Sequence, residues 1–216
     1  VGGTVSVITR PQIERLQAQD IRDLVRYEPG VRVVSDPARF GLEGFNIRGV
    51  QGNRVATRVD GVPLPDGFAV GSFSNAGRDQ IDPELVERIE ILRGPASALY
   101  GSDALGGIVS IATREPIDVA RRGDSALQLR SGWTSSDRAW RVSMLGAWQG
   151  EVHGLLLAAG ERRGHQTGNS AGAAGPDANP LDSQRRSAMA RWSGDFDGWR
   201  AGFALERYDQ SLDTDV

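Results

Sequence analysis

The pattern of hydrophobic and polar positions changes near residue 116. Before that point, short apolar runs are mixed with one stretch of helical spacing. After it, apolar and polar residues alternate one by one over long stretches. Alternation with a period of two is typical of strands with two different faces, and spacing of three and four is typical of helices. The sequence therefore predicts a mixed α/β region followed by an all-β region.

In the first region, Val5–Thr9 predicts a strand whose two valines, Val5 and Val7, face the core. Pro11 suits the first turn of a helix, and a broken apolar stripe over residues 13–25 continues the helical pattern. The stripe restarts after Asp20, which we expect to cap the second helical piece.

The stretch 84–113 organises this region. Val86–Leu92 predicts a strand, which Gly94 and Pro95 end. Ala96–Tyr100 predicts one helical turn, and Ile108–Ala112 predicts a second strand. Local pattern alone is equally compatible with one βαβ-like piece of a soluble α/β domain.

The segment LRGPASALYGSDALGGIVSIATR closely resembles the C-terminal signature of the plug domain of TonB-dependent outer-membrane receptors. Two upstream pieces, Phe45–Gly49 and Val59–Gly61, follow the order that this family shows. Three matching pieces in order are a much more specific signal than one glycine motif. The resemblance implies an α+β plug domain over residues 1–118, followed over residues 119–216 by the first antiparallel strands of a truncated transmembrane β-barrel.

The second region predicts about five strands with apolar and small polar faces, which suits strands between lipid and a wet lumen. Its tryptophans fall near strand ends, as in interfacial girdles: Trp133, Trp140, Trp148, Trp192 and Trp199. The connection Arg163–Gln184 is long and polar and the others are short, so we expect it to be extracellular. A soluble antiparallel sandwich alternates equally well and is the alternative.

Five strands are too few to enclose a plug, since plugged transporters have about 22. The sequence also opens without a basic and apolar leader. We therefore expect a fragment that lacks the TonB box and the remaining barrel strands.

The composition narrows the classes of function. The net charge is −3, so no basic field favours nucleic acid, and cysteine is absent, so thiolate metal sites are excluded. The two histidines, His153 and His165, have no metal-binding spacing. Ser97 lies outside a GxSxG elbow. We therefore expect no enzyme, no catalytic residues and no resident cofactor or metal.

Two arginines precede glycine in the two strongest motifs, Arg48 and Arg93. The resemblance implies that they pair with acidic residues and lock the plug in the barrel. Because buried guanidinium groups need carboxylate partners, we expect Glu87 and Glu90 as partners within the plug. The alternative is a pair of solvated arginines at strand ends.

Substrate contacts in this family come from apical plug loops and barrel residues facing the vestibule. The resemblance therefore favours Phe40, Phe68 and Phe73 as substrate-facing aromatic residues, with packing against the barrel wall as the alternative. His165, in the predicted outer loop, is a candidate ligand-binding residue.

The motif spacing is most similar to the haem and haemoprotein branch of the family, although residues 1–118 contain no histidine. The resemblance implies a receptor in the outer membrane of a Gram-negative bacterium. Its partners would be TonB with its inner-membrane energising complex, outer-membrane lipid, and haem, a haemoprotein or a siderophore. A ferric-siderophore or cobalamin receptor is the alternative within the class, and a passive plugged channel or adhesin is the alternative outside it.

Overall fold

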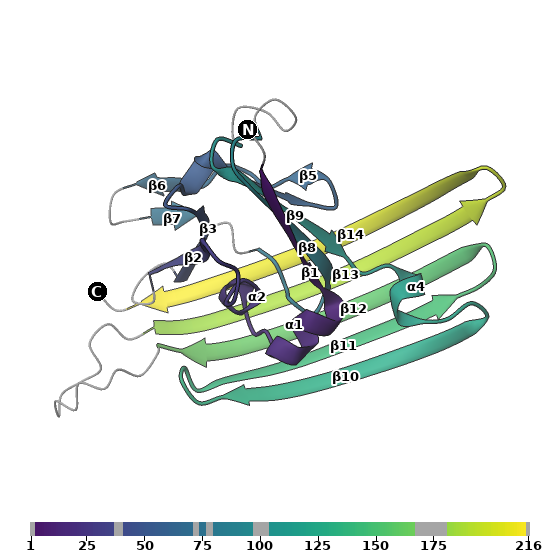
Figure 1. Ribbon diagram of the computed structural model, residues 1–216. Helices are drawn as coiled ribbons and strands as arrows, with labels where there is room; N and C mark the ends of the chain where they lie inside the picture. The colour runs from purple at the N-terminus through teal and green to yellow at the C-terminus, as the bar shows by residue number, and fades with distance from the viewer. Residues whose placement is uncertain are drawn as a thin grey trace. The chain divides into compact units, whose positions relative to one another are not determined.

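The computed structural model describes residues 3–36, 41–70, 74–76, 80–96, 104–166 and 181–214. The chain forms two compact units, Val1–Thr113 and Arg114–Val216, which we call unit 1 and unit 2. Unit 1 has mixed α/β structure and unit 2 is almost entirely strand (Figure 1). The predicted helical turn at 96–100 falls mostly outside the described residues.

Unit 1 begins with β1, α1 and α2, and its remaining described elements are short strands and one 3₁₀ turn. Their bounds are β1 Thr4–Thr9, α1 Arg10–Leu16, α2 Ile21–Leu24, β2 Val31–Asp36, β3 Gly41–Ile47, η1 Gly52–Arg54, β4 Val55–Val59, β5 Val62–Pro63, β6 Phe68–Val70, β7 Ser74–Ala76, β8 Val86–Arg93 and β9 Gly107–Thr113. The helical break is as predicted: Asp20 caps α2 by accepting hydrogen bonds from the backbone N–H groups of Arg22 and Asp23.

The main sheet of unit 1 has the order β1-β8-β9-β4-β5. It is mixed, because β4 and β9 run parallel while β1, β8 and β9 pair antiparallel. One face of this sheet contributes to a core of buried isoleucine, leucine, valine and phenylalanine side chains. Its most buried large members are Ile21, Leu24, Ile47, Ile89, Ile91 and Ile111.

The prediction that the two valines of the first strand face the core is wrong. Val5 and Val7 are exposed at 60% and 47%, and Ile8 is the buried residue of β1. Register explains the difference, because Ile8 lies opposite Ile89 in β8 and shares its buried face. A period-two pattern fixes alternation but not which side is buried.

Unit 2 consists of a short helix, α4 Pro116–Val119, and one antiparallel sheet in the sequential order β10-β11-β12-β13-β14. The strands are long: β10 Asp124–Thr134, β11 Ala139–Gln149, β12 His153–His165, β13 Leu181–Phe196 and β14 Trp199–Thr214. The predicted five antiparallel strands are confirmed. Every helix in the described residues is too short or too polar to cross a bilayer.

The strands on either side of the long connection extend farther than predicted. The ladder between β12 and β13 continues to the pair His165 and Asp182, so the connection is residues 166–180 rather than Arg163–Gln184. The sequence pattern missed these ends because charged residues replace apolar ones there, although the backbone pairing goes on.

Candidate functional site

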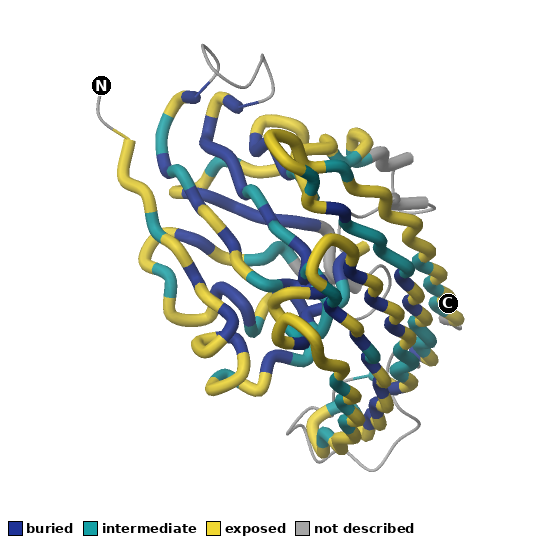
Figure 2. The backbone as a smooth tube through the Cα atoms, turned by 90° about the vertical axis from the view of Figure 1, so that its right-hand side faces the viewer, coloured by how far each residue is buried: buried dark blue, intermediate teal, exposed yellow. Residues whose placement is uncertain are grey.

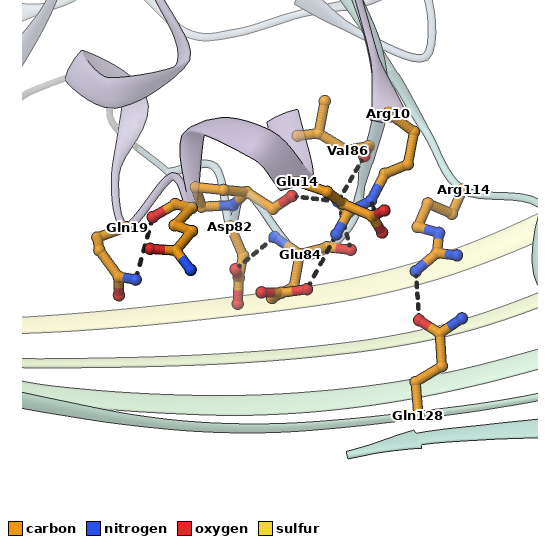
Figure 3. A network of polar contacts seen from close by, with 10 residues as sticks. Arg10, Glu14, Gln19, Asp82, Glu84, Val86, Arg114 and Gln128 are labelled. Carbon is orange, nitrogen blue, oxygen red and sulfur yellow. Dashed lines mark hydrogen bonds and ion pairs between the residues drawn. The ribbon is translucent and has the colours of Figure 1, made fainter. Parts of the chain in front are cut away.

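The side chain of Arg10 is buried at the point where β1 becomes α1 (Figure 3). Its Nη1 donates to the carbonyl oxygens of Pro83 at 2.8 Å and Val86 at 3.0 Å. Its Nη2 pairs with Glu84 at 3.1 Å, and its Nε pairs with Glu14 at 3.1 Å. This guanidinium therefore ties the start of α1 to the turn that precedes β8.

A second buried arginine, Arg93, lies near the opposite end of β1. Its Nη2 donates to Ser6 Oγ of β1 at 2.9 Å and pairs with Glu28 at 2.5 Å. Ser6 lies opposite Ile91 in the register, so it shares the face of Arg93. Arg93 therefore links the C-terminal end of β8 to β1 and to the segment after α2.

We call these two groups, Arg10 with its partners and Arg93 with its partners, the clasps of β1. β1 lies at the edge of its sheet and buries one large apolar side chain, Ile8. Hydrophobic burial contributes about 1.5–3 kcal/mol for such a residue. Removing one partner of a buried ion pair typically costs about 3–5 kcal/mol. The clasps therefore attach β1 through Ser6 and through the residue that directly follows the strand, Arg10, to distant parts of unit 1.

A third polar attachment joins the Asp60-Gly61 turn to the end of β9. Asp60 has a φ of 49°, in the left-handed region, which suits its place in the turn. Its carboxylate also accepts hydrogen bonds from Thr113 N at 2.8 Å and Thr113 Oγ1 at 2.5 Å. The turn therefore fixes the last residue of unit 1.

The four residues predicted to lock the plug do not form one cluster within unit 1. Arg48 lies exposed in the turn after β3, with a φ of 50°. Glu90 is exposed and pairs with Arg88 of its own strand at 2.9 Å. Glu87 is half-buried on β8. Arg93 is buried, but its carboxylate partner is Glu28.

Two of the three predicted substrate-facing phenylalanines, Phe40 and Phe73, lie outside the described residues. Phe68 begins β6, where only the backbone is described. His165 is the last residue of β12, not part of the connection as predicted, and its Nδ1 lies 2.5 Å from Asp182 Oδ1. No group of three or more potential metal ligands occurs in the described part of the chain.

The sheet of unit 2 exposes its apolar side chains on one face, which we call the apolar face. Buried and exposed residues alternate along these strands (Figure 2). On β12, for example, Leu156 is fully buried while Leu157 is 53% exposed. The large exposed members of this face are Leu127, Leu129, Trp133, Trp140, Val142, Met144, Trp148, Leu155, Leu157, Trp199, Phe203 and Leu205.

Aromatic residues gather at both ends of the apolar face. At the end with the short turns, His153 stacks on Trp192, and Phe196 stacks on Trp199 with ring centroids 4.3 Å apart. At the other end, Trp133 and Trp140 face each other in the register. An apolar band between two aromatic girdles is the pattern of strands that cross a membrane.

A mixed α/β domain followed by membrane-crossing antiparallel strands defines the class of plugged outer-membrane barrel proteins. Residues 1–108 match the family described as TonB-dependent Receptor Plug Domain. The chain belongs to this family.

Curated relatives extend this similarity. A probable hemoglobin and hemoglobin-haptoglobin-binding protein 4 of Haemophilus influenzae is 34% identical over 174 residues, covering 76% of this chain and 17% of the relative. Lactoferrin-binding protein A of Neisseria meningitidis is 36% identical over 170 residues, covering 74% of this chain and 18% of the relative. The chain thus spans less than a fifth of the length of these relatives.

Solved structures share the fold. The FrpB iron transporter from Neisseria meningitidis has a TM-score of 0.76 at 19% identity, over 95% of this chain and 31% of that one. The siderophore receptor PirA from Acinetobacter baumannii has a TM-score of 0.69 at 23% identity, over 97% of this chain and 32% of that one.

Sequence reasoning missed Arg10, Glu28 and the second role of Asp60. Arg10 and its partner Glu84 are separated by 74 residues. Arg93 and Glu28 are separated by 65 residues. Charge type and spacing along the chain carry no signal for such distant pairs. The Arg93 motif was found, but its nearest acidic neighbours in sequence were not its partners in space.

Proposed function

We propose that this chain is part of an outer-membrane receptor that takes up an iron-bearing ligand, haem or a haemoprotein, with energy supplied through TonB. The plug-family match of residues 1–108 carries the proposal. The relatives named for hemoglobin binding and lactoferrin binding support iron acquisition as the purpose. Residues 1–118 would serve as the plug and 119–216 as the first barrel strands.

Uptake would require the plug to change from an ordered to a partly released form when TonB pulls. β1 is suited to such a change, because it is an edge strand with little apolar burial and two localised clasps. An attachment made of a few localised polar contacts would be released in discrete steps.

The roles of individual residues form a second part of the proposal. Arg48, Arg93, Glu87 and Glu90 would lock the plug, with Arg93 acting through Glu28. Phe40, Phe68 and Phe73 would contact the substrate. His165 would contribute from the external end of β12, where its pairing with Asp182 orients the ring.

Growth on defined iron sources tests the proposed substrate. Deleting the gene in the source bacterium should abolish growth on haem or hemoglobin as the sole iron source, and growth on ferrous salts should be unchanged. Loss of siderophore use with normal growth on haem would favour the ferric-siderophore alternative and contradict the haem assignment.

Dependence of uptake on TonB distinguishes a receptor from the alternative, a passive channel or adhesin. In a strain without TonB, cells should still bind the iron ligand at the surface but should accumulate none inside. Equal accumulation with and without TonB would contradict energy coupling.

Complementation with a His165→Ala gene, beside the matched His153→Ala control, would show whether the histidine at the external end matters for ligand binding.

A further inference from the structure

The apolar face of unit 2 ends in a boundary that crosses the strands obliquely. On β11 its apolar residues continue to Trp140. On β12 the last one is Ala159, which lies opposite Met144, four residues short of that limit. On β14 the last one is Leu205. The register places Leu205 level with Leu157 of β12, so it lies two residues farther than Ala159 from the end of the strands that carries the long connection.

Strand tilt explains this obliquity. Strands in membrane barrels are tilted by about 35–45°. A boundary perpendicular to the barrel axis therefore crosses rows of directly paired residues at an angle. The apolar limit on β11–β14 follows that course, so we take it as the level where hydrocarbon gives way to lipid headgroups.

Beyond the boundary, each of three neighbouring strands carries one arginine on this face. Arg186 on β13 and Arg207 on β14 are the first residues there, and Arg163 on β12 is the second, after Glu161. In the register, Arg163 pairs with Gln184 and Arg207 pairs with Ala188. Each arginine is thus displaced by two residues from the next, which places them on a diagonal along the boundary. Side chains on such diagonals are about 7–8 Å apart.

Acidic groups orient these arginines through their Nε atoms. Glu161 Oε1 accepts from Arg163 Nε at 2.8 Å and from Arg186 Nε at 3.3 Å. Asp209 Oδ2 accepts from Arg207 Nε at 2.7 Å. The guanidinium of Arg163 also lies 5.5 Å from the ring centroid of Trp140, a cation–π contact.

The outer ends of two guanidinium groups, those of Arg163 and Arg186, remain available, whereas Arg207 Nη2 already donates to Asp209 Oδ1 at 3.4 Å. Among the described residues, the Nη atoms of Arg163 and Arg186 have no hydrogen-bond acceptor. The side chains of Arg163, Arg186 and Arg207 are 52%, 58% and 79% exposed. Farther from the band, Asp182 and Asp213 face each other in the register. At the level of the boundary, three arginines stand against two carboxylates, Glu161 and Asp209, so this group keeps one net positive charge.

We propose that Arg163, Arg186 and Arg207 bind the phosphate groups of an anionic lipid in the leaflet at the long-connection end of the strands. The arrangement supplies forked donors that match phosphate geometry, next to an apolar surface that accepts acyl chains. Outer-membrane barrels have short turns on the periplasmic side and longer loops outside, so this is the external leaflet. The proposal rests on the fold of unit 2 and is independent of which iron ligand the receptor transports.

Native mass spectrometry of the receptor, expressed from its full reading frame and purified in detergent, tests the lipid site. The probes are diphosphorylated lipid A, the same lipid without its phosphates, and inorganic phosphate. The test variant is Arg163→Gln/Arg186→Gln/Arg207→Gln. The matched control, Arg121→Gln/Arg122→Gln/Arg200→Gln, removes three arginines at the short-turn end of the same unit.

We expect the wild-type receptor and the control to retain the diphosphorylated lipid equally. We expect the triple variant to bind it about tenfold more weakly or worse, because each lost charge-assisted contact weakens phosphate binding. Where the triple variant does not fold, Arg186→Gln alone should weaken binding about threefold.

Any of three results of the lipid-binding measurement would overturn the proposal: equal retention by the triple variant, equal retention of the dephosphorylated lipid, or displacement of the lipid by millimolar inorganic phosphate. Cross-linking of these arginines to a second protein in place of lipid would also overturn it. None of these outcomes depends on iron uptake, so they leave the proposed transport function unaffected.

Discussion

Unit 1 and unit 2 both consist largely of strands, yet they place their large apolar residues in opposite ways. In unit 1 the large apolar residues, such as Ile89 and Ile111, are buried in one core. In unit 2 many of the largest apolar residues, such as Leu157 and Phe203, are exposed together on one face. Monomeric soluble proteins rarely expose an apolar surface that large. Strands therefore enclose a buried core in unit 1 and present an apolar surface in unit 2.

Arginine shows the same contrast. In unit 1, Arg10 is buried and its three nitrogen atoms all have partners in the chain. In unit 2, Arg163 and Arg186 are exposed and share one carboxylate. A buried arginine fixes two segments to each other, whereas an exposed arginine at a lipid boundary is placed to bind something outside the chain.

Removing the Arg10 clasp should have the largest effect. Arg10→Ala removes the guanidinium that pairs with Glu84 and donates to two carbonyl oxygens, so we expect a loss of about 3–5 kcal/mol. Hydrogen exchange of the β1 and β8 amides in the receptor would measure it. Arg15→Ala, at an exposed position of the same helix, should change exchange little. Unchanged protection of β1 in Arg10→Ala would mean that the clasp does not hold the strand.

A charge on the apolar face of unit 2 should be costly only in lipid. Leu157→Arg should destabilise the receptor in phosphatidylcholine vesicles by about 2–4 kcal/mol, as for arginine near the bilayer midplane. Val152→Arg, in the short turn before β12, should cost about 0–1 kcal/mol because it lies near the interface. Denaturant titration in vesicles measures both. Equal costs would mean that the apolar face does not span the membrane.

The α2 cap should matter at an intermediate level. Asp20→Ala removes the acceptor for two backbone N–H groups, and such caps contribute about 1 kcal/mol. Faster exchange restricted to α2 is the expected signal. The isosteric control is Asp20→Asn, which keeps an acceptor oxygen and should retain most of the stability.

The smallest effect should come from Glu90. Its ion pair with Arg88 is exposed, so Glu90→Gln should change stability by about 0.5 kcal/mol or less. Thermal unfolding of the receptor measures this change. A loss several times larger would show that Glu90 has a buried partner in the receptor, as its predicted locking role requires.

Local rules predicted much of this fold. The helix break at Asp20 and the alternating strands of unit 2 follow from capping and periodicity, which act over a few residues. The buried side of β1 could not be predicted, because it depends on register with β8 some 80 residues away. The extra length of β12 and β13 was hidden for a different reason: cross-strand pairs such as Glu161 and Arg186 sustain the ladder without apolar residues.

The candidate site divides in the same way. The glycine-flanked motif pointed to Arg93, but its partner Glu28 is distant in sequence and became evident only in the fold. Arg10 belongs to no motif, and its acceptors are mostly backbone carbonyl oxygens, which every residue carries. A sequence motif can therefore indicate that an arginine is important, but it does not predict which residues that arginine contacts.

The two clasps hold β1 at different distances from its N-terminal end, and this sets an order of rupture under load. A pull applied at Thr4 reaches the Ser6–Arg93 bond first and Arg10 last. Peeling would therefore proceed in two steps, with the higher force at the second. A single-molecule trace would show an early small drop followed by a later, larger one, and the interval between them would report the length of chain from Ser6 to Arg10.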